Sequence, residues 1–266
     1  MKKLSKIVSI LLVFSIIFST FSLAFGDESV IEINSFDDLL SMSNNPSASY
    51  KLMVDIDMTD YCNEWKPFAF SGTFDGNGHY LKGFTVRSSD DIRTVLDANR
   101  KEYSAVCAGL FSSLENACVM NLNVYDMMVD IGNGIHSEGG DFSESAFVGL
   151  LAGYAYNSTV KNCVFYGTSC ISTSGHCFGN GGIVGFAGHG SFENCVTDTT
   201  LVCIDTDVQY KDEQFMGGVY AFGYSDILNC NIHIDGYDSD HGYVHNGGMV
   251  GCFMYYDKVD VGKTNL

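Results

Sequence analysis

Short apolar segments led by glycine recur along the chain, and an asparagine follows each at a nearly constant distance. The segments are Gly109-Leu110-Phe111, Gly149-Leu150-Leu151, Gly182-Ile183-Val184 and Gly218-Val219-Tyr220, with a fifth copy beginning at Gly248-Met249-Val250. The asparagines stand 11 to 13 residues later, in Asn121-Leu122, Asn162-Cys163, Asn194-Cys195 and Asn229-Cys230. Self-similarity at a spacing of 32 to 41 residues is typical of stacked architectures, in which each unit buries its apolar face against its neighbours.

Each unit holds three short runs of strand character, separated by Ser, Gly, Asn and Asp. In the third unit the runs are 182–187, 192–197 and 201–205, with the length and flanking residues of strands. No helical stripe is present between residues 105 and 257. The pattern predicts an all-β fold, a parallel β-helix (solenoid), rather than a β-propeller, whose blades need four strands.

Equivalent positions of the units form columns. The third residues of the opening strands are Phe111, Leu151, Val184, Tyr220 and Val250, and the fourth residues, all small, are Ser112, Ala152, Gly185, Ala221 and Gly251. A small residue at a fixed place indicates a tight approach at a corner. Asn180-Gly181 and Asn246-Gly247 predict turns with positive φ. The recurrent asparagines predict a ladder of stacked amides with a structural role.

The cysteines of the repeats behave as an interior column. Cys163, Cys195 and Cys230 align with Leu122 and Val261, and buried cysteine acts as a small hydrophobe. Stacked side chains about 4.8 Å apart suit the disulfide torsion badly, so thiols are expected. Bridges of Cys170 with Cys177 or of Cys62 with Cys107 stay open. The ten cysteines include no Cys-x-x-Cys pair, which argues against a zinc ribbon or redox motif.

The region before the repeats predicts an N-terminal cap. Val30 to Ile33 alternates like a strand, and Ser35 is the expected N-cap of a short helix with Asp38 three residues later. Residues 28–50 would close one end of the stack. We expect residues 27–104 to hold the cap and first coils, and residues 105–266 the repeats, in one continuous domain.

The first residues have the pattern of a secretory signal peptide. Lys2, Lys3 and Lys6 precede an apolar stretch over 7–25. We expect residues 1–26 to be removed and the mature chain to begin at Asp27, the alternative being an uncleaved anchor. No later segment predicts a membrane span. The protein is therefore expected to be secreted, extracellular or on the cell surface.

The net charge of the chain limits the classes of binding partner that are expected. The formal net charge is −18, and only Lys161 and Lys211 among the lysines lie between residues 102 and 257. Such a surface repels nucleic acid and anionic lipid, so neither is an expected partner.

Several segments resemble bacterial surface proteins that carry the GLUG motif. They are 50–57, Trp65-Lys66-Pro67, 70–79, and the glycine segments Gly149-Leu-Leu-Ala-Gly153 and Gly182-Ile-Val-Gly185. Gly109-Leu-Phe-Ser112 departs from the motif by its serine. The resemblance covers roughly residues 30–261. It implies a right-handed β-helix, export and surface display, and it implies no particular activity or catalytic residue.

The sequence lacks the motifs of metal-dependent and nucleophilic catalytic sites. No His-Glu-x-x-His or Gly-x-Ser-x-Gly segment is present. Asp235, Asp238 and Asp240, near His241 and His245, offer oxygen ligands for calcium, although their spacing does not match an EF-hand and a solvated acidic loop is the simpler interpretation. We therefore assign no catalytic, cofactor-binding or metal-binding residue, and expect no cofactor, with calcium as the alternative.

Polysaccharide cleavage is the enzymatic alternative. Parallel β-helices host lyases and inverting hydrolases, and hydrolysis needs two carboxyl groups across the sugar. Gly188-His189-Gly190 resembles a polygalacturonase motif, but its Asn-Thr-Asp and Arg-x-Lys companions are missing. Cys177 after His176 has no third group that would orient a nucleophile.

Binding is the function that the sequence favours. The longest insertions fall at one place in the repeat, at 130–146, 205–216 and 235–246, and would project from one face. Tyr210, Tyr237 and Tyr243 would stand there beside carboxylates, a combination that suits sugars; the alternative is variable loops with tyrosines folded back. We expect a secreted or surface-displayed module for adhesion or ligand binding, with host or microbial glycans as candidate ligands and without intrinsic catalysis. A structural stalk is a third possibility.

Overall fold

The computed structural model describes residues 29–61, 65–96, 102–131, 145–173, 177–205, 213–239 and 243–253. Its contacts separate Met1–Val30 from a unit that runs from Ile31 onward, and only that unit is described below. The predicted signal peptide, residues 1–26, lies outside the described residues. Among the described residues, no helix combines the length and the apolar character that a membrane crossing requires.

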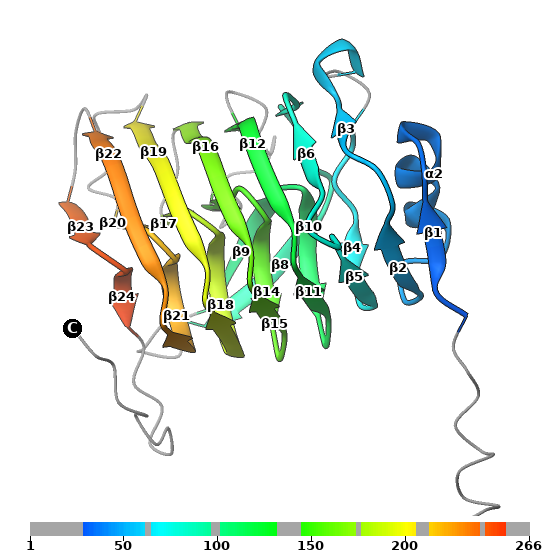
Figure 1. The fold of residues 1–266 in the computed structure, drawn as a ribbon. Helices are drawn as coiled ribbons and strands as arrows, with labels where there is room; N and C mark the ends of the chain where they lie inside the picture. The colour runs from blue at the N-terminus through cyan, green and yellow to red at the C-terminus, as the bar shows by residue number, and fades with distance from the viewer. Residues whose placement is uncertain are drawn as a thin grey trace, which may run out of the picture. The chain divides into compact units, whose positions relative to one another are not determined.

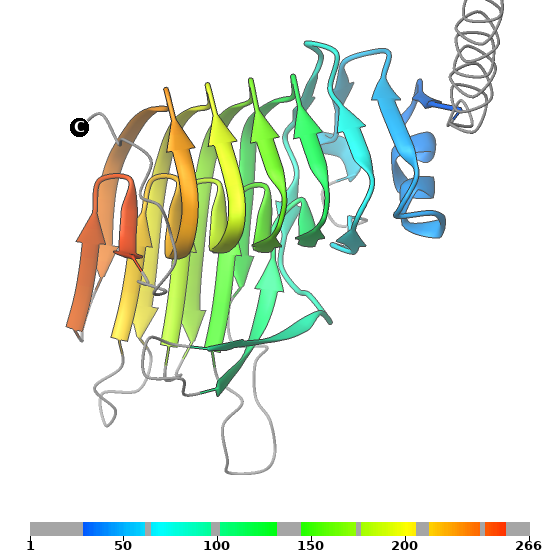
Figure 2. The same cartoon turned by 90° about the horizontal axis from the view of Figure 1, so that it is seen from below.

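Strands dominate the unit and form three sheets (Figures 1 and 2). The first sheet contains β1 (Ile31–Ile33), β2 (Ser49–Leu52), β4 (Ala69–Phe70), β5 (Thr73–Asp75), β10 (Phe111–Glu115), β11 (Cys118–Met120), β14 (Ala152–Tyr156), β15 (Thr159–Lys161), β18 (Val184–Glu193), β21 (Tyr220–Leu228) and β24 (Val250–Phe253). The second contains β3 (Ile56–Asp57), β6 (Tyr80–Lys82), β7 (Thr85–Val86), β12 (Asn123–Ile131), β16 (Val164–Thr173), β19 (Val196–Asp205) and β22 (Asn231–Ser239). The third contains β8 (Ile92–Leu96), β9 (Glu102–Ala108), β13 (Ser145–Gly149), β17 (Cys177–Gly181), β20 (Glu213–Gly217) and β23 (Tyr243–Gly247).

Successive units visit the three sheets in the same order. The third unit runs from β17 in the third sheet to β18 in the first and β19 in the second, and the fourth follows through β20, β21 and β22. Each strand pairs in parallel with its counterpart one unit later, as β17 with β20 and β19 with β22. Among the described strands only β8 and β9 pair antiparallel. The prediction of an all-β fold is confirmed.

The recurrent asparagines form corners between the first and second sheets. Asn121, Asn162, Asn194 and Asn229 all have φ of +52° or +53°, the left-handed conformation that asparagine tolerates better than most residues. The strand predicted over 192–197 is therefore wrong, because the chain turns at Asn194 between β18 and β19.

Side-chain amides join these corners from one unit to the next. Asn162 Nδ2 donates to Asn121 Oδ1 at 3.2 Å, and Asn194 Nδ2 donates to Asn162 Oδ1 at the same distance. Asn121 Nδ2 in turn donates to Asp75 Oδ1 at 2.9 Å. The predicted amide ladder is thus confirmed for these three asparagines.

The residue after each corner points into the core. Leu122, Cys163 and Cys195 have no exposed surface, and Cys230 is half-buried. Cys163 Sγ lies 3.2 Å from the Lys161 carbonyl oxygen, and Cys195 Sγ lies 3.5 Å from that of Glu193. All three cysteines are thiols, as predicted.

The two bridges left open by the sequence have different outcomes. Cys107 is a buried thiol, so the structure does not contain the Cys62–Cys107 bridge. The bridge of Cys170 with Cys177 is not tested, because the side chain of Cys177 lies outside the described residues. Cys62 and Val261 lie outside the described residues as well.

Several predicted positions of the repeat are wrong. Ala152, which was predicted at the fourth position, takes the third in place of Leu151 and pairs with Phe111 and Val184. The reason is that Gly149 pairs with Gly181 and not with Gly182, which shifts the register by one residue from the predicted alignment.

Asn180 and Asn246 belong to β17 and β23, and neither has a positive φ, so the turns predicted at both positions are wrong. The buried side-chain amide of Asn180 donates to the carbonyl oxygens of Ser169 and Val202 at 2.7 and 2.9 Å. Asn180 therefore connects neighbouring strands inside the protein instead of forming a turn.

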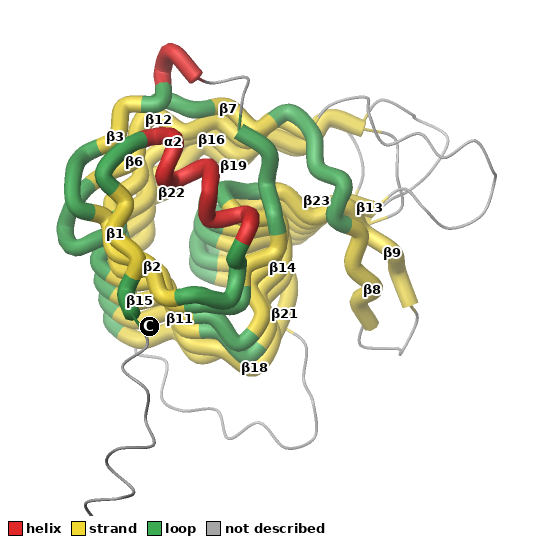
Figure 3. Tube along the Cα trace, turned by 90° about the vertical axis from the view of Figure 1, so that its right-hand side faces the viewer, coloured by secondary structure: helices red, strands yellow, loops and turns green. Residues whose placement is uncertain are grey.

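The short strand and helix predicted before the repeats are both present. The α-helix α2 (Phe36–Ser41) follows β1, and short 3-10 helices span Met42–Asn44 and Thr59–Tyr61. Ser35 Oγ accepts from Asp38 N at 3.2 Å, and Asp38 Oδ2 accepts from Asn34 N at 3.0 Å, which satisfies amides at the helix start. In the end-on view α2 crosses the end of the stack (Figure 3), and Leu39 on this helix belongs to the core.

The amide ladder makes Asn194 a sensitive position. We expect Asn194→Ala to lower the free energy of unfolding by about 1–3 kcal/mol, since a left-handed alanine costs about 1–2 kcal/mol and a ladder hydrogen bond about 1 kcal/mol. Urea unfolding followed by circular dichroism measures the change. Asn194→Gly is the matched control, because it keeps the backbone conformation and loses only the amide. Equal loss in both variants would contradict a left-handed corner.

The interior thiols should be unreactive in the folded protein. Contact with the Cys163 thiol, together with burial, raises the pKa of Cys195 from 9.0 to about 12, so the thiolate is scarce at neutral pH. Because the folded pKa is the higher one, the stabilisation from the neutral thiol is full below about pH 9 and is lost as the pH rises towards 12. Iodoacetamide at pH 8, followed by mass spectrometry, should leave Cys163 and Cys195 unmodified until urea is added. Alkylation at the same rate with and without urea would show that the column is open.

Candidate functional site

The outer face of the first sheet carries two neighbouring columns of side chains. In the first, Ser113, Tyr154, Phe186, Phe222 and Cys252 pair in register, and in the second, Glu115, Tyr156, Gly188 and Tyr224 do so. The residues between the columns, Leu114, Ala155 and Ala187, belong to the main core. Because side chains alternate between the two faces of a strand, both columns face away from that core.

A second apolar cluster fixes this face against the third sheet. Phe186 and Phe222 pack with Phe147 of β13 and Phe215 of β20, at ring-centroid distances of 5.1 to 6.2 Å. In the end-on view β9 and β13 lie on the same side of the molecule as β14 and β21 (Figure 3). The cluster therefore covers Phe186 and Phe222 of the first column and leaves Tyr156 of the second column exposed to solvent.

We name the exposed part of this face the aromatic ledge. It consists of Tyr154, Tyr156, His189 and Tyr224, and it packs against the buried Phe186. The rings of Tyr154 and Phe186 stack at 5.2 Å with planes 5° apart, and those of Tyr154 and Tyr156 lie 6.4 Å apart and 11° from parallel. Tyr156 is 38% exposed, and the His189 side chain is exposed. The ledge is thus a set of flat rings held by one another, with solvent on one side.

Gly188 allows two of these rings to converge. A Cβ atom at Gly188 would lie 3.1 Å from both the Tyr156 ring and the Tyr224 hydroxyl. His189 stands edge-on to both tyrosines, at 5.3 and 4.7 Å. A glycine between two tyrosines in the same column therefore lets their rings close over the strand.

Tyr154 keeps its phenol neutral. Burial, reinforced by the charge of Glu115, raises the pKa of Tyr154 to about 12. Its hydroxyl is consequently both a donor and an acceptor of hydrogen bonds over the physiological range.

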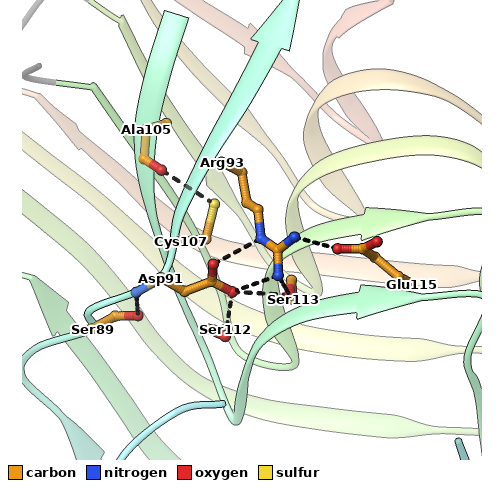
Figure 4. Close-up of polar contacts among 8 residues, drawn as sticks. All are labelled: Ser89, Asp91, Arg93, Ala105, Cys107, Ser112, Ser113 and Glu115. Carbon is orange, nitrogen blue, oxygen red and sulfur yellow. Dashed lines mark hydrogen bonds and ion pairs between the residues drawn. The ribbon is translucent and has the colours of Figure 1, made fainter. Parts of the chain in front are cut away.

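A charged network lies at the β10 end of the ledge (Figure 4). Arg93 Nε is 2.7 Å from Asp91 Oδ1, Arg93 Nη1 pairs with Glu115 Oε1, and Arg93 Nη2 donates to Ser113 Oγ at 2.8 Å. The hydroxyls of Ser112 and Ser113 donate to Asp91 Oδ2 at 2.6 and 2.9 Å. Burial opposes the charge of Arg93, but the hydrogen bond and charge of Asp91 outweigh it and raise the pKa of Arg93. The network ties β8 to β10 and leaves the Glu115 side chain 42% exposed beside the rings.

His189 occupies a corner as well as the ledge. Its φ is +51°, and it follows Gly188 as Asn157 follows Tyr156 and Asn116 follows Glu115, both with positive φ. Asn157 Nδ2 donates to Asn116 Oδ1 at 2.7 Å. The segment Gly188-His189-Gly190, noted as similar to a polygalacturonase motif, therefore continues a second row of left-handed corners.

The acidic segment near the end of the chain is less loop-like than predicted. Asp235, Tyr237 and Asp238 lie in β22, and Tyr243 and His245 lie in β23, so the projecting insertion expected over 235–246 is wrong over most of its length. Their side chains lie outside the described residues, as do Tyr210, Asp240, His241 and most of the insertions at 130–146 and 205–216. Where side chains are described, no group of three or more His, Cys, Asp or Glu residues is placed to hold a metal ion.

Sequence reasoning missed the aromatic ledge. The signal was the alternation Tyr154-Ala-Tyr156 and Phe222-Gly-Tyr224 directly after the opening segments of two units. Comparisons of the chain with protein-family models, curated proteins and solved structures found no match in any of the three. The functional argument therefore rests on the geometry of this face.

Arg93 should hold β8 in place. We expect Arg93→Met to speed amide hydrogen exchange in β8 and β9 and to lower the free energy of unfolding by about 1–3 kcal/mol, because it removes hydrogen bonds to charged groups. Arg87→Met is the matched control. Arg87 pairs with Asp130 but is 63% exposed, and exposed ion pairs contribute about 0–1 kcal/mol. Equal effects of the two changes would show that the network does not anchor the strand.

Proposed function

We propose that the chain is a secreted or surface-displayed, right-handed parallel β-helix of the GLUG-motif kind that serves adhesion by binding carbohydrate and has no catalysis of its own. Three features support the β-helix: the ordered visits to three sheets, the parallel pairing in register, and the stacked asparagine corners. Support for export is the apolar stretch after Lys2, Lys3 and Lys6.

The aromatic ledge is the observation that carries the binding function. Tyrosine rings present flat apolar faces, which stack on the apolar faces of sugar rings, while their hydroxyls meet sugar hydroxyls. The exposed part of Glu115 adds carboxylate acceptors at one end. Because the rings are already packed against one another and the apolar cluster beneath, little ordering accompanies binding.

The charge of the chain favours carbohydrate over other polymers. At a formal net charge of −18, nucleic acid and anionic membranes are repelled. A sugar polymer without charge meets no such barrier.

A polysaccharide-degrading enzyme is the second candidate, favoured by two carboxylates beside the ledge. Asp91 and Glu115 both contact Arg93. In that arrangement the guanidinium occupies the space between them, where an inverting hydrolase needs the sugar and a water molecule. Release of new reducing ends from a bound polysaccharide would establish this function in place of simple binding.

A glycan and mucin array probed with the mature protein tests the proposed function. We expect binding to at least one carbohydrate, and a loss of about tenfold in affinity on Tyr156→Ala, since one stacked ring is worth about 1 kcal/mol or more. Tyr156→Phe should bind nearly as well, because it keeps the ring. Failure of the unchanged protein to bind any carbohydrate on the array would reject the proposal.

A further inference from the structure

We propose that the aromatic ledge takes a linear, uncharged polysaccharide, bound as a run of consecutive sugars along the direction in which the strands stack. This inference rests on the proposed function and adds the class and length of the ligand. It excludes a single terminal sugar and an anionic polymer such as a uronate chain.

The length follows from the register. Glu115, Tyr156, Gly188 and Tyr224 form one column across β10, β14, β18 and β21. Three steps between neighbouring strands of about 4.8 Å each span about 14 Å. Tyr156 and Tyr224 are two of these steps apart, about 10 Å, so a ligand that uses both tyrosines needs more than one sugar, and one that also reaches Glu115 is longer still.

The shape of the surface favours a chain that lies flat. The Tyr156 and Tyr224 rings approach Gly188 from the strands on either side of it, so the two rings follow one another along the direction in which the strands stack. Neighbouring flat rings offer successive stacking positions along a line. A deep pocket for the end of a chain is a different arrangement, in which polar groups surround one sugar.

The charges beside the ledge disfavour anionic polymers. Among the described residues that contact the ledge or its network, the permanent cation is Arg93, and both Asp91 and Glu115 pair with it. Glu115 contributes negative charge beside Tyr156, and the whole chain is acidic. A uronate or sulfated chain would meet repulsion without a free cation to offset it.

A second row of tyrosines supplies a matched control on another sheet. Tyr80, Tyr125 and Tyr166 lie beside one another on β6, β12 and β16, at 5.8 and 5.4 Å between ring centroids. The rings of this row are partly exposed. They follow the same stacking direction on the second sheet, without the Asp91–Arg93–Glu115 network.

Calorimetric titration of the mature protein tests the inference with defined probes. The probes are cellohexaose, mannohexaose and chitohexaose, their disaccharides, and hexagalacturonate. We expect at least one uncharged hexasaccharide to bind at least about tenfold more tightly than its own disaccharide, and hexagalacturonate not to bind. Tyr156→Ala should weaken the hexasaccharide about tenfold, whereas Tyr166→Ala should change it less than about twofold.

A further variant separates ring placement from loss of the ring. Gly188→Ala keeps every tyrosine but adds a methyl group 3.1 Å from two of them, and it should weaken the hexasaccharide more than the disaccharide. Circular dichroism of each variant confirms that it is folded.

Three results would overturn the inference while leaving carbohydrate binding in place. They are equal affinity for hexasaccharide and disaccharide, a preference for hexagalacturonate, and a loss confined to Tyr166→Ala. Binding of other array glycans but of none of the uncharged hexasaccharides would overturn it as well. Failure of every carbohydrate, on the array and in solution, would instead reject the proposed function itself.

Discussion

The stacking of left-handed asparagine corners is the constraint on which the rest of the structure depends. Asn121, Asn162 and Asn194 share one backbone conformation and hydrogen-bond amide to amide. Each corner is thereby fixed directly over the one before it. Residues at a fixed distance from the corner then fall into columns, which is why Leu122 and Cys163 share one interior line.

The same register produces the face on which the functional proposal rests. Once β10, β14, β18 and β21 are aligned, alternation sends Tyr154 and Tyr156 to the outer face together. The third sheet then decides which of the outer residues are covered, because its phenylalanines bury Phe186 and Phe222 and leave Tyr156 exposed. A one-residue slip would reverse this arrangement, since it moves every side chain to the opposite face.

Local chemistry in the sequence was sufficient to predict the all-β class, the helix cap at Ser35 and the amide ladder, because each rests on a short-range rule that few residue types satisfy. The alignment of Leu151 failed because Gly149 pairs with the first glycine of Gly181-Gly182 and not with the second, a choice that the sequence pattern does not reveal. Asn180 was predicted in a turn, although carbonyl groups from two other strands hold its amide. The ledge needed the position of the third sheet, a long-range property that no single segment encodes.

A crystal structure of residues 27–266 soaked with a linear, uncharged hexasaccharide tests the central claim most directly. The account predicts Glu115, Tyr156, Gly188 and Tyr224 in one outward column, with sugar rings lying flat on Tyr156 and continuing towards Tyr224. Sugar bound on another face, or these four residues on different sides of the molecule, would contradict it.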